Sequence, residues 1–239
     1  MGPSVGTDMT ASDVTLTDGA ETFRVTRFDP VTPERLVLFG VGAGGDAGRH
    51  LGLMERLAAD GAIVMAPHFA RLLPPNVPAE DLEMRARRMR LALDAAMQPG
   101  LPVAGVGHSI GASMLLALAG GQMWTRGGEQ LAIEPDARLE RIVMLAPPTG
   151  FFRAPGALDA VRAPIMAWAG TADDVTPPAQ VAFLRDTLGD RVPFETRMVE
   201  GAGHFSFMDQ TPRGASEPHP DQPAFVAELA DEICRFVAA

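Results

Sequence analysis

Ser109 stands between two glycines, Gly107 and Gly111, where a short apolar run ends and a run with helical spacing begins. This Gly-x-Ser-x-Gly spacing is typical of a sharp turn from a strand into a helix that exposes the serine hydroxyl as a nucleophile. Side chains at the two glycine positions would collide with the backbone in so tight a turn. The simpler alternative is that Ser109 only caps the helix, since serine is favoured at that position. The choice depends on whether catalytic partners occur elsewhere in the chain.

A serine hydroxyl attacks a carbonyl at neutral pH when a base lies within hydrogen-bonding reach and a carboxylate orients that base. Asp173 follows the apolar run 164–170, and His204 follows the more polar run 194–201. Both residues therefore lie just beyond the ends of predicted strands. The chain order Ser, Asp, His is also the order in proteins with this serine turn. We predict that Ser109, Asp173 and His204 form a catalytic triad.

Other residues could take the place of the acid or the base. Asp174 neighbours Asp173 and could replace it by a shift of one residue. The four remaining histidines are less well placed than His204. They are His50 in a predicted helix, His68 at a strand end where it could line the cleft, His108 beside the serine with its side chain turned elsewhere, and His219 in the proline-rich surface loop 211–223.

A second glycine-rich segment, "FGVGAGG", follows the predicted strand 35–41 and fits the pattern G-x-G-x-x-G. A dinucleotide site of that type also needs an acidic residue at the end of the next strand, but that strand ends "MAPHF". The loop instead suits acyl transfer, in which backbone N–H groups stabilise the negative charge on the carbonyl oxygen. We expect the N–H groups of Ala43 and Ile110 to form this oxyanion hole, with Gly42 against the substrate. No cofactor and no metal are expected.

Strand and helix patterns alternate along most of the chain. The segment 14–28 alternates around Asp18-Gly19 and predicts an antiparallel hairpin. Short apolar runs then predict buried strands at 35–41, 62–69, 102–107, 141–147 and 164–170, with a more polar edge strand at 194–201. Helical spacing occurs at 48–59, 79–97, 110–120, 177–188 and 223–238. We predict an α/β fold: one doubly wound, mostly parallel sheet in a single domain over 13–239, after a flexible tail over 1–12.

Charge and composition exclude several classes of function. The net charge of −10 disfavours nucleic acid and anionic membranes as partners. The only cysteine, Cys234, excludes an internal disulfide. No apolar run is long enough to span a membrane, and the first residues lack a signal sequence, so we expect a cytoplasmic protein. The basic segment 85–90, "RARRMR", is expected to form a solvated helix face paired with Glu80, Asp81 and Glu83.

The segments "GHSIG", "GTADDVTPP" and "GAGHFSFMD" together resemble the α/β-hydrolase superfamily, and within it the small bacterial serine esterases and dienelactone-hydrolase-like proteins. The resemblance runs from about residue 14 to the end of the chain. It implies the α/β-hydrolase fold, here without a cap domain because the gap between residues 147 and 164 is too short. Many relatives have His-Gly where this chain has Val41-Gly42. Dienelactone hydrolases themselves carry cysteine at the nucleophile position, so we do not infer their lactone as the substrate.

The sequence therefore predicts a serine hydrolase that cleaves small, uncharged, partly apolar carboxylic esters. Thioesterase, acyltransferase and metal-free perhydrolase activities remain alternatives with the same triad, and a binding protein that lost its chemistry is a further one. A homodimer is left open. Apolar loop residues are expected to border the cleft and contact the substrate: Phe69, Phe151, Phe152, Phe205, Phe207 and Met208.

Overall fold

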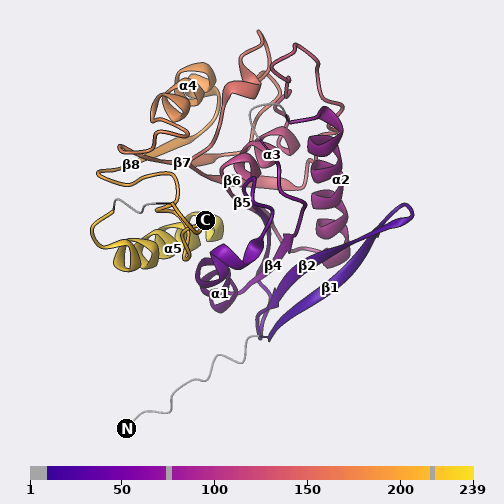
Figure 1. Cartoon of the computed structure of the whole chain (residues 1–239). Coiled ribbons are helices and arrows are strands. Elements are labelled where there is room, and N and C mark those ends of the chain that lie inside the picture. The colour runs from indigo at the N-terminus through magenta and orange to yellow at the C-terminus, as the bar shows by residue number, and fades with distance from the viewer. Residues whose placement is uncertain (1–9, 74–76, 216–218) are drawn as a thin grey trace.

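The computed structural model describes residues 10–73, 77–215 and 219–239. One eight-stranded sheet runs through it in the order β1-β2-β4-β3-β5-β6-β7-β8 (Figure 1). In chain order the strands are β1 (Thr10–Asp18), β2 (Glu21–Asp29), β3 (Arg35–Gly40), β4 (Ala62–Pro67), β5 (Val103–His108), β6 (Leu139–Leu145), β7 (Ile165–Gly170) and β8 (Phe194–Val199). Strands β3 to β8 are mutually parallel, and β2 joins β4 antiparallel.

Helices cover both faces of the sheet. The α-helices are α1 (Leu51–Ala59), α2 (Ala79–Ala96), α3 (Ile110–Leu118), α4 (Ala179–Leu188) and α5 (Gln222–Ala238), and the 3-10 helices are η1 (Ala47–His50), η2 (Gly150–Phe152) and η3 (Gly189–Arg191). Between β6 and β7 only the three-residue η2 intervenes. The predicted fold class, including the N-terminal hairpin and the missing cap domain, is confirmed.

Successive side chains of a strand point to opposite faces of the sheet, so the core has two layers, one on each face. On β3, Leu36 and Leu38 belong to the core layer that contains residues of α2, α3 and α4, whereas Val37 and Phe39 belong to the layer that contains residues of α1 and α5. Every residue of β3 is buried, which explains why the strand reads as a continuous apolar run rather than an alternating one. All the parallel strands end at one edge of the sheet. Residues that follow those ends therefore gather there.

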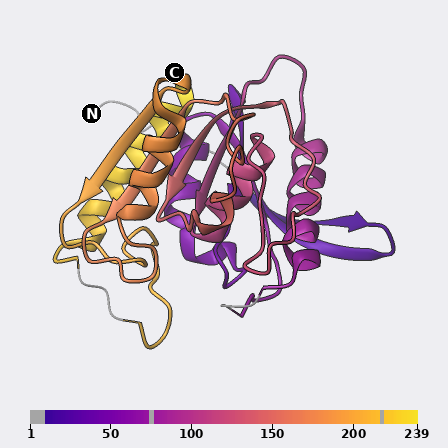
Figure 2. The same ribbon diagram turned by 90° about the horizontal axis from the view of Figure 1, so that it is seen from above.

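The N-terminal boundary differs from the prediction. Strand β1 begins at Thr10, so residues 10–12, assigned to the tail, lie in the sheet. Their backbone pairs with residues 27–29 of β2, in the register Thr10↔Asp29, and this pairing extends the hairpin beyond the alternating segment. The hairpin projects past α2 (Figure 2). The rest of the predicted tail, residues 1–9, lies outside the described residues.

The basic segment 85–90 does not form the solvated face that was predicted. Arg85 is 1% exposed and Arg88 is 9% exposed. Arg87 and Arg88 form ion pairs with Asp18 of the hairpin, at 2.7 and 3.1 Å. Arg88 also pairs with Glu21. The prediction was wrong for two reasons. β1 and β2 cover part of α2, so Arg87 and Arg88 pair across the fold and not along the helix. Arg85 lies against the loops after β3 and β4.

Close backbone contact joins the β5–α3 turn to the end of β3. A Cβ atom at Gly111 would lie 2.1 Å from the carbonyl oxygen of Gly40 and 2.6 Å from that of Val41. At Gly107 it would lie 2.8 Å from the amide nitrogen of Ala112. These neighbours are backbone atoms, which cannot turn aside as a side chain can. Glycine at both positions is therefore a packing requirement of the turn.

A row of buried aromatic side chains leads from β3 to the loop after β8. The ring of His50 lies 5.0 Å from that of Phe39 and 5.3 Å from that of His108. The His108 ring is in turn 4.9 Å from that of His204. His50 is 1% exposed and His108 is fully buried. Burial lowers the pKa of His50 to about 4, with the charge of Arg49 acting in the same direction.

The contact at Gly111 predicts a large effect of one added methyl group. Gly111→Ala should lower the free energy of unfolding by about 3 kcal/mol, because the new Cβ overlaps the backbone of β3. Gly150→Ala is the matched control, since a Cβ there has no neighbour within 4 Å. Urea denaturation of both variants measures the difference. Equal unfolding midpoints for Gly111→Ala and the control would contradict the packing argument.

The buried His50 makes the stability of the fold depend on pH. Below about pH 6.5 the unfolded chain binds a proton at this residue that the folded chain binds only near pH 4. Stability is therefore lost as the pH falls through this interval. Between about pH 7 and about pH 4.5 the wild type should lose roughly 2 kcal/mol more free energy of unfolding than His50→Phe. Urea titrations at both pH values test this. Parallel losses in the two proteins would show that His50 is not a neutral buried imidazole.

Candidate active site

Ser109 lies at the carboxyl end of β5 in a strained backbone conformation. Its φ is 55° and its ψ is −130°, a region that non-glycine residues rarely occupy. The Ser109 N–H donates to the carbonyl oxygen of Leu145, at 2.8 Å, which fixes the turn against β6. Ser109 precedes α3, but its side chain makes no capping hydrogen bond. The interpretation of Ser109 as only a helix cap is therefore wrong.

The three side chains of the predicted triad form one line of hydrogen bonds. Ser109 Oγ lies 3.0 Å from His204 Nε2, and His204 Nδ1 lies 3.0 Å from Asp173 Oδ2. The line runs along the carboxyl edge of the sheet, because Ser109 follows β5, Asp173 follows β7 and His204 follows β8. Asp173 is 3% exposed and His204 is 7% exposed. An imidazole so placed can accept the serine proton while the carboxylate holds its orientation.

Asp173 rather than Asp174 occupies the acid position. Its Oδ1 accepts the N–H groups of Val175 and Thr176, at 2.9 and 2.7 Å, and its Oδ2 accepts the Thr176 hydroxyl at 2.7 Å. Burial on its own would raise the pKa of Asp173. The hydrogen bond and charge of His204, with the bonds from Thr176, outweigh burial and hold that pKa below its usual value. Asp174 is exposed to solvent.

Thr176 is part of the site and was missed in the sequence. Its Oγ1 lies 2.9 Å from His204 Nδ1 and 3.0 Å from the carbonyl oxygen of Ala146. Ala146 directly follows β6 and has a φ of 47°, so it is a further strained residue near the triad. The Asp-x-x-Thr spacing was the available signal, since an aspartate commonly accepts hydrogen bonds from residues two and three positions on. Thr176 ties the acid and the base to the end of the neighbouring strand.

His108 forms a hydrogen bond with the backbone of His204, the predicted base. Its Nε2 lies 2.9 Å from the carbonyl oxygen of His204. Burial first, and then the nearby His204 and His50, lower the pKa of His108 well below 6.5. The ring is therefore neutral and donates its Nε2 proton to that carbonyl. His68, which could have lined the cleft, instead bonds to Arg24 and Thr26 of β2 at 2.9 and 2.8 Å.

The loop after β3 lies against the serine. A Cβ atom at Gly42 would be 3.5 Å from the Cβ of Ser109 and 3.3 Å from His108 Nδ1. Within the described part of the chain, neither the Ala43 N–H nor the Ile110 N–H donates a hydrogen bond to the protein. One of these amides directly follows Ser109 in the chain, and the other belongs to the loop that lies against it. Free amides of this kind are the donors that a developing oxyanion needs.

Arg85 reaches this loop from α2. Its Nη1 donates to the carbonyl oxygen of Gly42 at 3.1 Å, and its Nη2 donates to that of Ala70 at 2.7 Å. The run of arginines predicted a solvated helix face for this residue. Helical spacing could have found it, since the buried residues Leu82 and Met89 lie three positions before and four after.

The apolar loop residues divide into two groups. Phe69, Phe151 and Phe205 are partly exposed. The expectation that Phe152 and Phe207 border the cleft is wrong, because each side chain is only 1% exposed and belongs to the core. Met208 is 6% exposed, similar to His204 at 7%, and its contact with substrate stays a prediction. Phe152 packs against Gly121, and Phe207 packs edge-on against Phe225 at 5.6 Å.

The sequence did not single out three further exposed apolar side chains. Leu73 lies in the loop after β4 and is 71% exposed, and Val175 lies in the loop after β7 and is 57% exposed. Leu51 is the first residue of α1 and is 37% exposed.

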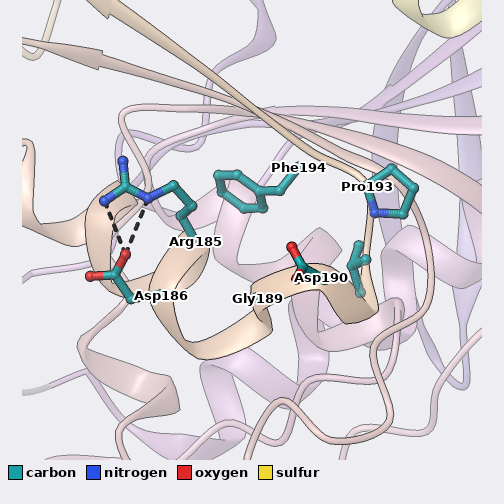
Figure 3. A pocket seen from close by; sticks show the side chains of 7 residues that line it. Arg185, Asp186, Gly189, Asp190, Pro193 and Phe194 are labelled. Carbon is teal, nitrogen blue, oxygen red and sulfur yellow. Dashed lines mark hydrogen bonds and ion pairs between the residues drawn. The ribbon is translucent and has the colours of Figure 1, made fainter.

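A separate hollow of about 530 Å³ lies away from the triad (Figure 3). It is formed where α4 ends and β8 begins, whereas His204 follows the other end of β8. Its lining residues are Arg185, Asp186, Gly189, Asp190, Val192, Pro193 and Phe194, and an ion pair of 2.9 Å joins the first two. Among the described residues there is no cluster of metal-binding side chains and no helix of sufficient length and hydrophobicity to cross a membrane.

No family model and no curated protein matches the chain significantly. Solved structures do. A dienelactone hydrolase from Anabaena variabilis shares 20% identity, with a TM-score of 0.65 over 94% of this chain and 96% of its own. Esterase 2 of Thermogutta terrifontis, phosphoramylated by tabun, shares 17%, with a TM-score of 0.68 over 98% and 96%. A dienelactone hydrolase-like promiscuous phosphotriesterase from metagenomic libraries shares 21%, with a TM-score of 0.71 over 98% of both chains. With the sheet order and the strained serine turn, these likenesses show that the chain has the α/β-hydrolase fold.

Proposed function

We propose that the protein is a serine hydrolase that cleaves carboxylic esters through an acyl-enzyme on Ser109. The observation that carries this proposal is the unbroken line of hydrogen bonds from Asp173 through His204 to Ser109, which ends on a serine in a strained turn. Solved structures of similar fold include proteins named as dienelactone hydrolases and as an esterase, which supports hydrolysis as the class of reaction.

The proposed reaction uses the groups of the site in turn. His204 Nε2 takes the proton of Ser109 as Oγ bonds to the ester carbon, and the carbonyl electron pair moves onto oxygen. The N–H groups of Ala43 and Ile110 would stabilise that oxyanion. When the carbonyl re-forms, the alkoxide leaves with the proton from His204. A water molecule then attacks the acyl group, with His204 as base, and releases the acid and the free serine.

Charge and exposed apolar surface favour an uncharged ester with an apolar part. The net charge of −10 repels anionic substrates at long range. Val175 is 57% exposed, and its N–H donates to Asp173. Leu73 is 71% exposed and follows Leu72, whose N–H donates to the carbonyl oxygen of Ala43. Both side chains thus extend from segments that hold the site. Phe69, Phe151 and Phe205 are partly exposed and add apolar area in the loops after β4, β6 and β8.

Replacement of the nucleophile tests the proposal directly. Ser109→Ala should lower kcat/KM for a short-chain nitrophenyl ester by at least about 1,000-fold, because no acyl-enzyme can form. Mass spectrometry after fluorophosphonate treatment should find one adduct, on Ser109, in the wild type and none in the variant. Equal turnover by the two proteins would end the proposal. Comparison of oxyester with thioester turnover, with and without peroxide, separates the esterase from a thioesterase or perhydrolase.

The two adjacent aspartates provide a matched pair of variants. Asp173→Asn should lower kcat by roughly 1,000-fold or more, because an amide neither holds His204 in the required tautomer nor stabilises its charged form. Asp174→Asn removes the same charge one residue away and should leave kcat within about two-fold of wild type, since an exposed side chain can be changed with little effect. Loss of activity in the second variant alone would assign the acid to Asp174.

A further inference from the structure

Arg85 is a buried cation with no acidic partner. Its side chain lies within α2 and is 1% exposed, yet it forms no ion pair with a carboxylate anywhere in the described ranges. Burial lowers its pKa to about 10, partly opposed by the charge of Asp81, so the guanidinium stays charged at neutral pH. A buried unpaired charge destabilises the fold unless its hydrogen bonds are well made. What it binds therefore indicates what it does.

The guanidinium joins the loop that lies against the serine, after β3, to the adjacent loop after β4. Its donors reach the carbonyl oxygens of Gly42, after β3, and Ala70, after β4, at 3.1 and 2.7 Å. Its Cζ also lies 4.7 Å from the ring centroid of Phe69. The loops meet directly as well, since the Phe69 N–H donates to the carbonyl oxygen of Gly45 at 2.9 Å. Arg85 thus fixes the loop after β3 against a second element.

The bond to Gly42 has a specific consequence for the oxyanion hole. The carbonyl of Gly42 and the N–H of Ala43 belong to one planar trans peptide, in which the two bonds point in opposite directions. Arg85 and the Gly45 N–H, at 3.0 Å, hold that carbonyl on one side. The Leu72 N–H, at 2.8 Å, holds the next carbonyl, that of Ala43. The Ala43 N–H is thereby held in one orientation, without a protein acceptor of its own.

The charge of Arg85 strengthens the same group as a donor. A hydrogen bond from a cation to a carbonyl oxygen is stronger than one between neutral groups. It also polarises the peptide, so the N–H at the other end becomes a better donor in surroundings of low dielectric constant. Both effects stabilise an oxyanion, which carries a full charge, more than a neutral ester carbonyl. The gain therefore belongs to the transition state and not to substrate binding.

We propose that Arg85 is a positioning residue that orients and polarises the Gly42–Ala43 peptide so that its N–H serves the oxyanion hole. The inference rests on the proposed function, since it needs an oxyanion to form at Ser109. It also explains how this loop is braced in a chain that has Val41-Gly42 in place of His-Gly.

Steady-state kinetics of Arg85→Ala test the proposal. We expect kcat for a nitrophenyl ester to fall roughly 10- to 100-fold, in line with the loss of one oxyanion donor. KM should stay within about two-fold, because ground-state binding does not use the oriented amide. The acid limb of the pH profile should not move, because the hydrogen bonds of Ser109, His204 and Asp173 are untouched. Ethylguanidinium should restore part of the lost kcat, whereas ethylammonium should not, since only the planar fork reaches both carbonyls.

Arg90→Ala is the matched control, because it removes the same side chain from a partly exposed position of α2. Its kcat should equal that of wild type. If Arg85→Ala does not fold, as judged by circular dichroism, Arg85→Lys takes its place: one retained bond and the charge should leave an intermediate kcat at unchanged KM.

The outcomes separate this inference from the proposed function. Unchanged kcat in the Arg85 variants, or a loss of kcat with a parallel rise in KM and no response to ethylguanidinium, overturns the role of Arg85 alone. A wild type that neither turns over esters nor forms a fluorophosphonate adduct on Ser109 overturns the proposed function and the inference with it.

Discussion

The backbone contact between Gly111 and Gly40 is the constraint on which the site depends. It joins the first turn of α3 to the end of β3, with 2.1 Å between the Gly40 carbonyl oxygen and the place where a Cβ of Gly111 would be. The same approach sets Gly42 against Ser109, so the nucleophile and the loop with the free amide are brought together by one contact. The strained backbone of Ser109 costs about 1 to 3 kcal/mol. Packing of α3 between the strands and α2 offsets this cost.

The loops above the sheet are held largely by side chains that bind carbonyl oxygens. His108 binds the carbonyl of His204, and Arg85 binds those of Gly42 and Ala70. Loop carbonyls that lie beyond the last strand pairing need such donors when they are buried. Each donor is itself buried, so its position is set by the core and not by solvent. This arrangement transmits the rigidity of the sheet to loops that would otherwise be the most mobile part of the fold.

Sequence predicted best what depends on local pattern. Strands such as β3 read as continuous apolar runs because both faces are covered, and a serine between two glycines specifies its turn by sterics alone. Arg85 was misplaced because a run of arginines is usually solvated, and nothing local shows that the hairpin and two loops close over α2. Phe152 and Phe207 were misplaced for a similar reason: an aromatic residue in a loop can face a cleft or the core, and only the path of the chain decides. Thr176 carried a usable local signal in its spacing from Asp173.

Residues 146–164 form no cap domain over the carboxyl edge of the sheet. For the proposed hydrolysis, transition-state stabilisation would therefore depend mainly on dipoles that the fold holds in place. An uncovered site has few remote contacts with which to orient a substrate or exclude water, so little binding energy is available to strain the ester. Rate enhancement must then come mainly from groups already in place before the substrate arrives: the Asp173–His204 pair and the two free amides. Such groups stabilise the charge of the transition state, and their effect depends little on the shape of the rest of the substrate. In this proposal, exposed apolar side chains on the segments that hold the site, such as Leu73 and Val175, would determine which esters bind well enough to react.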